Sequence, residues 1–277
     1  MPLAIIDIER FEDKPHCWCA VVPNAGEEWL QYLANKYREL RTEPVVPLSD
    51  IAVDGITVLK KSALEQVLAR AVLPDRGTGK FSVARSDFGE TISYCLLKDK
   101  YGTLFGYKSI RDRELIQLTG RGIDAIGVEC PDGEPLHLIL GETKTSADPS
   151  SPPQVVDSNR DSLRAQHQAH LSELQNTCRK VWDAARRSRD KHTQDLLSVA
   201  ALYLQEEQWQ NLRVVAFSCL VRPRNLYKST DYGSFLNSPT DFHPSKIRFT
   251  TFCVPFDDME AVIDKWLELA QGNEVSK

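Results

Sequence analysis

The sequence has no long apolar run and no basic segment at its start. No stretch approaches the roughly 20 consecutive apolar residues that a transmembrane helix needs. The first residues include Asp7 and Glu9, where a secretory signal would carry basic residues before an apolar core. These absences argue against a membrane-spanning or exported protein, so we expect a cytoplasmic protein with no membrane partner.

Clustered cysteines and a complete phosphate loop are also missing. The seven cysteines are scattered through apolar segments, so we expect reduced core residues. Only Cys17 and Cys19 lie close together, and without a second pair they make a poor zinc site. Segment 76–81 (Arg-Gly-Thr-Gly-Lys-Phe) is similar to a Walker A loop, but Pro74 and Phe81 stand where that loop needs glycine and a hydroxyl residue. We therefore expect a flexible turn there, with a phosphate contact from its backbone as the alternative.

An excess of basic residues is missing as well, because the net charge is −5. A free-standing DNA-binding protein is normally basic. The charge is uneven, however, since residues 1–54 carry most of the acidic excess and the C-terminal half carries basic runs. Such runs are either solvated faces or contacts to phosphates. The candidates for nucleic-acid contact are Arg186, Arg187, Arg222 and Arg224.

What the sequence does contain is a strong β-hairpin signal. Two apolar segments, 123–129 and 136–145, flank the turn sequence Cys-Pro-Asp-Gly-Glu-Pro. Charge interrupts these strands at Asp124, Glu142 and Lys144. Charged groups inside apolar strands need partners, so these three residues are candidates for a site.

The spacing of these residues predicts a metal site. Residues two apart share one face of a strand, so Glu142 and Lys144 project together, the carbonyl of Thr143 lies between them, and Asp124 can meet them from the neighbouring strand. Two carboxylates and a carbonyl form a hard oxygen site suited to Mg²⁺ or Mn²⁺. An adjacent ammonium can hold an attacking water or a phosphate. We therefore predict Asp124, Glu142 and Lys144 as catalytic residues for phosphodiester cleavage.

A purely structural alternative also fits the motif. Glu142 and Lys144 could form an ion pair near a strand end, with Asp124 capping a turn. The apolar run that leads into Glu142 favours the metal site, and so does Gly141, which lets another backbone approach closely.

An Asp on one strand followed by Glu-x-Lys on the next resembles the active site of the PD-(D/E)xK nuclease superfamily. The proline that precedes the Asp in the motif is replaced here by Ile123. From Ser86 onward, the expected order of helix, strand, two motif strands, helix and strand matches the αβββαβ core of that superfamily. The resemblance implies an α/β fold with a PD-(D/E)xK restriction-endonuclease-like core in residues 81–277, after an N-terminal α/β extension in residues 1–80.

The helix before the motif strands carries a further candidate. The sequence Asp-Phe-Gly-Glu at residues 87–90 is expected to open a helix that runs to about Tyr101 and is apolar on two sides. In many enzymes of the superfamily this helix supplies a metal-binding Glu, so the resemblance implies that Glu90 is a metal ligand. The alternative is a capping box, in which Glu90 bonds a free backbone N–H near Asp87.

Apolar periodicity predicts the remaining elements. We expect strands at 16–22, 51–59, 103–110, 212–221 and 247–255, and helices at 27–40, 62–73, 157–189, 194–206 and 259–269. His167 and His170 lie on or beside the apolar side of the longest helix. They could serve a metal, although a hydrogen-bonded pair at the edge of the core is the commoner arrangement.

Three segments also resemble the HamA family, the nuclease subunits of the bacterial Hachiman anti-phage defence system. They are residues 87–90, 120–128 and 140–146, which read DFGE, GRGIDAIGV and LGETKTS. The resemblance implies an Mg²⁺-dependent DNA endonuclease subunit that works with HamB, a superfamily 2 helicase; this chain has no helicase motif of its own. Two alternatives remain open, a non-catalytic interaction module with a nuclease fold and a nuclease that acts on RNA.

Overall fold

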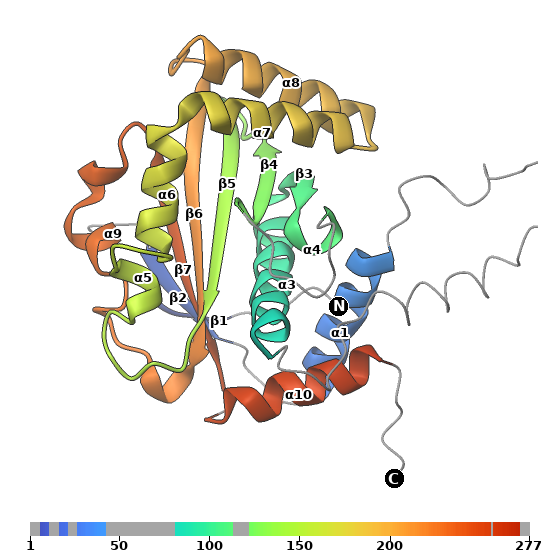
Figure 1. The fold of residues 1–277 in the computed structure, drawn as a ribbon, viewed down its shortest axis with the longest axis vertical. Coiled ribbons are helices and arrows are strands. Elements are labelled where there is room, and N and C mark those ends of the chain that lie inside the picture. Colours follow the sequence, from blue (N-terminus) through green and yellow to red (C-terminus); the bar gives the residue numbers. More distant parts are fainter. Residues whose placement is uncertain are drawn as a thin grey trace, which may run out of the picture.

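A mixed seven-stranded sheet runs through the part of the chain that the computed structural model describes, which is residues 6–10, 17–21, 27–42, 81–112, 122–255 and 257–271 (Figure 1). Its strand order is β1-β2-β7-β6-β5-β4-β3. The strands are β1 (Ile6–Arg10), β2 (Cys17–Val21), β3 (Leu104–Lys108), β4 (Ala125–Glu129), β5 (Leu136–Thr145), β6 (Leu212–Pro223) and β7 (Lys246–Val254). The predicted mixed α/β fold is confirmed.

Helices cover both faces of this sheet. The longer ones are α1 (Glu27–Thr42), α3 (Phe81–Tyr101), α6 (Leu163–Ser172), α7 (Leu174–Arg187), α8 (Lys191–Gln205) and α10 (Met259–Ala270). The single-turn helices are α4 (Ser109–Asp112), α5 (Gln154–Asp157) and α9 (Ser234–Asn237), and the 3₁₀ turns are η2 (Arg224–Leu226) and η3 (Pro239–Phe242). From α3 to β6, the order is a helix, three strands with the single-turn α4 between the first two, the crossover helices and a strand.

Strand β5 is the centre of this arrangement. It pairs antiparallel with β4, and parallel with β6 from Leu136 opposite Leu212 to Thr145 opposite Val221. A parallel partner needs a crossover connection, which here contains α5 to α8. The predicted strand 136–145 has the same bounds as β5.

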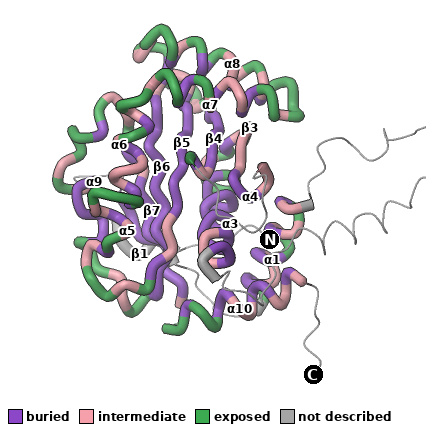
Figure 2. Tube along the Cα trace, in the orientation of Figure 1, coloured by how far each residue is buried: buried purple, intermediate pink, exposed green. Residues whose placement is uncertain are grey.

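Alternation along β5 assigns its residues to the two faces. Leu138 and Leu140 pack with α7 and α8, whereas Ile139 packs with α1, α3 and α10. Figure 2 shows that the central strands are buried along most of their length. This two-sided burial explains the continuous apolar run, and it places Glu142 on the same face as Leu138 and Leu140.

The described N-terminal elements share the sheet and core with the rest of the chain. β2 pairs parallel with β7, and α1 packs against α10 and α3. The rings of Tyr37 and Trp266 lie 4.6 Å apart between centroids. A domain boundary near residue 80 stays a prediction, and the expected elements at 51–59 and 62–73 lie outside the described residues, as does most of the loop 76–81.

The cysteines match the expectation of core residues, with one difference. All seven are free, and all but Cys130 are buried. Cys19 Sγ lies 3.2 Å from Cys253 Sγ across β2 and β7. Cys130 is exposed because it follows β4 in the hairpin turn.

Two expected helix boundaries are wrong. Helix α3 begins at Phe81, so Asp87 and Glu90 lie inside it, and the capping-box alternative is excluded. Asp87 is instead buried and accepts a hydrogen bond from Tyr37 Oη at 2.6 Å. A tertiary partner therefore satisfies a polar residue whose position suggested a helix start.

The predicted single helix 157–189 begins only at Leu163, after α5 has ended at Asp157, and it is divided into α6 and α7. The break is at Glu173, whose backbone angles are φ −111° and ψ 54°. Beside it, Thr177 Oγ1 donates to the carbonyl of His170 at 2.7 Å. The break lets α6 pack on β5 while α7 packs on β3.

A buried ion pair joins β4 to β7 near one end of the sheet. Arg248 Nη1 and Nη2 donate to the two oxygens of Glu129 at 2.8 and 2.9 Å. Burial alone raises the pKa of Glu129, but His137, Arg248 and Thr103 outweigh it and lower the pKa to about 2. The carboxylate is therefore ionised at neutral pH.

Replacing Arg248 with Met should lower the free energy of unfolding by about 3 kcal/mol at pH 7, because a buried carboxylate loses its partner. A carboxylate whose pKa is depressed in the folded state contributes stability above its unfolded pKa and loses it as pH falls toward the folded value. The difference from the parent should therefore shrink as pH is lowered from about 5 toward 2. Urea denaturation at pH 7, 5 and 3 measures it. The control is Arg213→Met, which removes an exposed pair with Glu134. A loss that is equal at all three pH values would contradict the account.

Candidate functional site

The β4–β5 hairpin brings Asp124 beside the Glu-x-Lys segment. Asp124 directly precedes β4, and its backbone N–H donates to the carbonyl of Gly141 at 3.0 Å. Its Oδ2 accepts the backbone N–H of Thr143 at 2.7 Å. A Cβ added at Gly141 would lie 3.0 Å from that of Ala125, so glycine permits this close approach. The predicted juxtaposition is present; the catalytic and metal-binding roles stay predictions.

Glu142 is fully buried, and its two oxygens have different surroundings. Oε1 lies 2.6 Å from His170 Nε2, whereas Oε2 has no hydrogen-bond partner among the described residues. Burial raises the pKa of this carboxyl well above its usual value, the ammonium groups of Lys144 and Lys180 oppose that rise, and Glu90 adds to it. The group is thus a buried carboxyl that lacks a compensating positive charge in direct contact.

Lys144 projects from the same face of β5 and is about one-fifth exposed. Its Nζ lies 2.7 Å from Oδ1 of Asp161, whose side chain is 84 % exposed. Exposed ion pairs contribute little to stability and exchange readily with solvent ions. A phosphate oxygen can therefore take the place of Asp161 beside the ammonium.

Glu90 reaches the site from α3 on the other side of the hairpin. It is buried, Ser86 Oγ donates to its Oε1 at 2.9 Å, and Tyr94 Oη lies 3.0 Å from its Oε2. Tyr94 Oη also lies 2.8 Å from the carbonyl of Asp124, and its single proton can serve only one acceptor fully. A Cβ added at Gly89 would lie 2.3 Å from Thr145 Oγ1, so α3 lies directly on β5 here. The close packing of α3 on β5 and the shared contact with Tyr94 place Glu90 near Asp124.

The donor set fits a divalent cation that prefers oxygen ligands. Oε2 of Glu142 has no partner among the described residues, and the carboxylate of Asp124 contacts the backbone of the adjacent Thr143. Hard cations bind carboxylate and carbonyl oxygens. No three His, Cys, Asp or Glu side chains converge as a ready-made metal cluster in the described part of the chain. Two carboxylates and a carbonyl leave the remaining positions to water and substrate, which is the usual situation for Mg²⁺.

Lys180 on α7 is a residue that the sequence did not single out. Its ammonium influences Glu142 and His170 electrostatically. Its Nζ would lie 3.4 Å from a Cβ added at Gly122, two residues before Asp124. No acidic side chain of the described residues pairs with it. Lys180 therefore adds a second positive charge near the predicted site, and only the packing of α7 could have revealed it.

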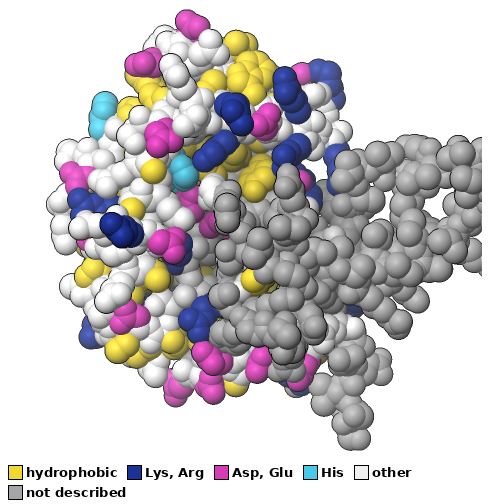
Figure 3. All heavy atoms as spheres, viewed as in Figure 1, with side chains coloured by type: hydrophobic (Ala, Val, Ile, Leu, Met, Phe, Trp, Pro, Cys, Tyr) yellow, Lys and Arg dark blue, Asp and Glu magenta, His cyan; other side chains and the backbone are white. Residues whose placement is uncertain are grey.

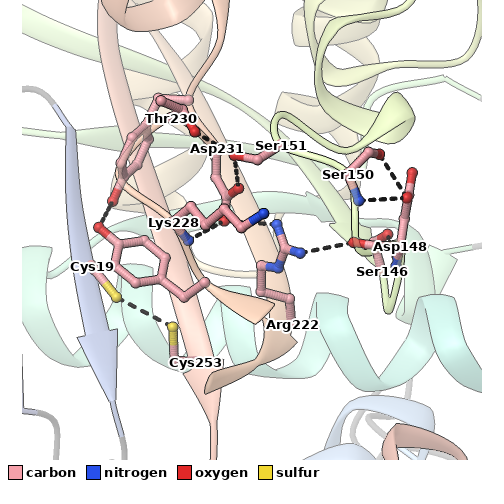
Figure 4. A network of polar contacts seen from close by, with 12 residues as sticks. Cys19, Ser146, Asp148, Ser150, Ser151, Arg222, Lys228, Thr230, Asp231 and Cys253 are labelled. Carbon is pink, nitrogen blue, oxygen red and sulfur yellow. Dashed lines mark hydrogen bonds and ion pairs between the residues drawn. The ribbon is translucent and has the colours of Figure 1, made fainter. Parts of the chain in front are cut away.

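The four predicted arginines do not form one surface. Arg222 is fully buried, its Nη1 lies 2.7 Å from Oδ2 of Asp231, and its Nη2 donates to the carbonyl of Asp148 at 2.8 Å (Figure 4). No Nη1 hydrogen of Arg222 points at Oδ2 of Asp231, so this contact is an ion pair without an aligned hydrogen bond. Arg222 holds two loops together and is no candidate for phosphate contact in this conformation.

The other three arginines are exposed, two of them on α7 and the third on a different surface. Arg186 and Arg187 belong to the last turn of α7, where the Arg187 guanidinium lies 5.9 Å from the centre of the Tyr107 ring. Arg224 begins η2 after β6, at the end of the sheet away from α7 and α8 (Figure 1). The α7 pair lies on the helix that carries Lys180, whereas Arg224 belongs to another surface.

The two histidines of α6 are buried and hydrogen-bonded, as the structural alternative predicted. His167 Nε2 lies 2.9 Å from Ser218 Oγ, and His170 contacts Glu142. Burial lowers the pKa of His167 to about 3 and that of His170 to about 4, so both rings are neutral at pH 7. The two ring centroids are 6.3 Å apart with the ring planes perpendicular.

Comparison with known proteins gives one match. A model of the HamA family matches residues 5–270. No curated protein and no solved structure matches the chain. Among the described residues, no helix has the length and apolar character needed to cross a membrane.

Replacing Glu142 with Gln tests whether the buried carboxylate binds metal. Its folded pKa is raised above the unfolded value, so the carboxyl costs stability increasingly as pH rises above that unfolded value. In EDTA, Glu142→Gln should melt at a higher temperature than the parent at pH 8, and the gap should narrow toward pH 5. Added Mn²⁺ should raise the Tm of the parent only. Glu206→Gln, at an exposed position after α8, is the control. Equal stabilisation of the parent and Glu142→Gln by Mn²⁺ would remove Glu142 from the metal site.

Proposed function

Because the chain belongs to the HamA family, which gives it a Hachiman-related anti-phage role, we propose that it is the metal-dependent DNA endonuclease subunit of such a defence complex. The observation that carries the proposal is the unpartnered Oε2 of the buried Glu142, beside Asp124 and on the same strand face as Lys144. Burying a carboxylate without a partner is costly, and a purely structural role gives no reason to retain it. This argument favours a nuclease over the non-catalytic alternative.

In this proposal, each residue has a role set by its position. Asp124, Glu142 and the Thr143 carbonyl hold Mg²⁺ or Mn²⁺. The bound cation supplies an activated water and neutralises charge on the phosphate during cleavage of the phosphodiester bond. Lys144 orients the attacking water or a phosphate oxygen once Asp161 is displaced.

Glu90 is the outer member of the proposed metal site. Ser86 Oγ donates to its Oε1, and Tyr94 Oη lies 3.0 Å from its Oε2. An ionised carboxylate has about four acceptor sites, so each oxygen can still bind a water of the cation or the cation itself. Its position on α3 matches the role that the superfamily resemblance implies.

The order of elements supports assignment to the PD-(D/E)xK superfamily. Helix α3, the antiparallel strands β3 to β5, the crossover helices and the parallel strand β6 follow the αβββαβ order. The candidate residues lie directly before β4, in the second half of β5 and on α3. We therefore assign the core of this chain to that superfamily.

Helix α7 provides the path that we propose for DNA. Arg179, Arg186 and Arg187 are exposed on it, and Lys180 is half-buried. An open groove of about 460 Å³ runs between α7 and α8, and its lining includes Arg179, Trp182 and Arg186. Figure 3 shows Lys and Arg side chains gathered over this region. Cations beside an aromatic ring suit a phosphate backbone and its bases.

A helicase partner completes the proposal. We propose that a HamB-like superfamily 2 helicase controls the nuclease, since family membership implies a multi-component defence system. Two features of the chain support external control. It is acidic overall, which disfavours approach to DNA, and its sequence contains no base-reading motif such as a helix-turn-helix.

Cleavage of supercoiled plasmid by the co-purified complex, with ATP and Mg²⁺, tests the proposed activity. Lys144→Ala and Glu142→Gln should each reduce the rate at least about 100-fold, because each removes a group that acts on the scissile phosphate. Lys98→Ala, at an exposed position on α3, should cleave like the parent. Glu90→Gln should also cleave poorly while keeping the parent Tm. Parent-like cleavage by Lys144→Ala would contradict the site assignment.

Double replacement of Arg186 and Arg187 by Ala tests the DNA path. Removal of two phosphate contacts should lower the magnitude of the slope of log K against log salt by roughly 2. Anisotropy of a labelled duplex in Ca²⁺, over a range of KCl, measures the slope without cleavage. Arg213→Ala is the control, and Arg224→Ala tests the second surface. An unchanged slope in the double variant would place the DNA elsewhere.

A further inference from the structure

His170 accounts for the difference between the two oxygens of Glu142. Oε1 is held 2.6 Å from His170 Nε2, and Oε2 is buried without a partner among the described residues. A carboxylate can turn about its terminal bond, which is a soft torsion. The hydrogen bond at Oε1 restricts that rotation and therefore fixes the direction in which Oε2 points.

His170 is itself held in place by neighbouring residues. Its side chain is only 8 % exposed, and its ring meets the edge of His167, whose Nε2 lies 2.9 Å from Ser218 Oγ. Ser218 is the residue of β6 that pairs with Glu142 in the sheet. On the C-terminal side, Thr177 Oγ1 donates to the carbonyl of His170. These contacts hold the imidazole of His170 beside Glu142, at the position where Glu142 pairs with Ser218 in the sheet.

The position of the proton gives the hydrogen bond its direction. A carboxylate that binds a metal is ionised, so it can only accept. The proton in the contact must then sit on Nε2 of His170. Donors of this kind orient the groups that ligate metals, and their removal typically lowers metal affinity 10–100-fold.

We propose that His170 is a positioning residue: its Nε2–H holds Oε1 of Glu142 and presents Oε2 to the divalent cation. The inference rests on the metal site of the proposed function, but it assigns to α6 a task that the nuclease motif does not contain. The break at Glu173 lets α6 pack on β5, where His170 meets Glu142, while α7 packs on β3.

The test compares Mn²⁺ binding by paramagnetic resonance in the full chain and its variants. His170→Phe keeps a ring and removes the donor, whereas His170→Gln keeps an N–H donor. We expect the Phe variant to bind Mn²⁺ roughly 10–100-fold more weakly than the parent, and the Gln variant to recover part of the loss. His192→Ala, at an exposed position on α8, should bind like the parent. In cleavage assays, the Mg²⁺ concentration for half-maximal rate should rise more than the rate at saturating Mg²⁺ falls.

Parent-like Mn²⁺ affinity in His170→Phe would overturn the proposal, and so would a parent that binds no Mn²⁺. If the Phe variant does not fold, His170→Ala takes its place, and weaker binding by Ala than by Gln is required. A parent that binds Mn²⁺ through Glu142 but cleaves no nucleic acid would remove the nuclease function and leave the positioning role intact.

Discussion

One fully buried carboxylate is the constraint on which this structure depends. Glu142 lies on the central strand β5 with one oxygen bonded to His170 and the other without a partner among the described residues. Such a group is unfavourable in a protein interior unless a positive charge compensates it. The surrounding elements supply positive charge near the carboxylate without contacting it, from Lys144 on the same strand and Lys180 on α7. We propose that a divalent cation supplies this compensating charge.

The register of the strand pairing brings the residues of the candidate site together. The antiparallel pairing of β4 and β5 sets Asp124 against Thr143, and the parallel pairing of β5 and β6 sets Ser218 beside Glu142. On one face α6 holds Glu142 through His170, and on the other α3 brings Glu90 toward Asp124 through Tyr94. The site therefore depends on packing from both faces of the sheet, so a change in either layer alters its geometry.

The pattern of apolar residues in the sequence predicted the central strands well. These strands are buried on both sides, so each appears in the sequence as a continuous apolar run. The uninterrupted apolar run of β5 defined its bounds, and residue spacing placed Asp124, Glu142 and Lys144 together. What failed depended on tertiary partners. Asp87 suggested a helix start because nothing local shows its bond to Tyr37, and Arg222 read as a surface charge because nothing local shows its partner Asp231. The break at Glu173 and the role of Lys180 likewise follow from how α7 packs, which periodicity does not encode.

The most direct test of the account is a crystal structure of the chain soaked in Mn²⁺, with anomalous data collected at the manganese edge. The account predicts an anomalous peak about 2.2 Å from Oε2 of Glu142, with the Asp124 carboxylate and the Thr143 carbonyl in the same coordination shell. His170 Nε2 should remain within hydrogen-bond distance of Oε1. Absence of the peak at saturating Mn²⁺, with Oε2 bonded to a protein group instead, would contradict the central claim that Glu142 is a metal ligand.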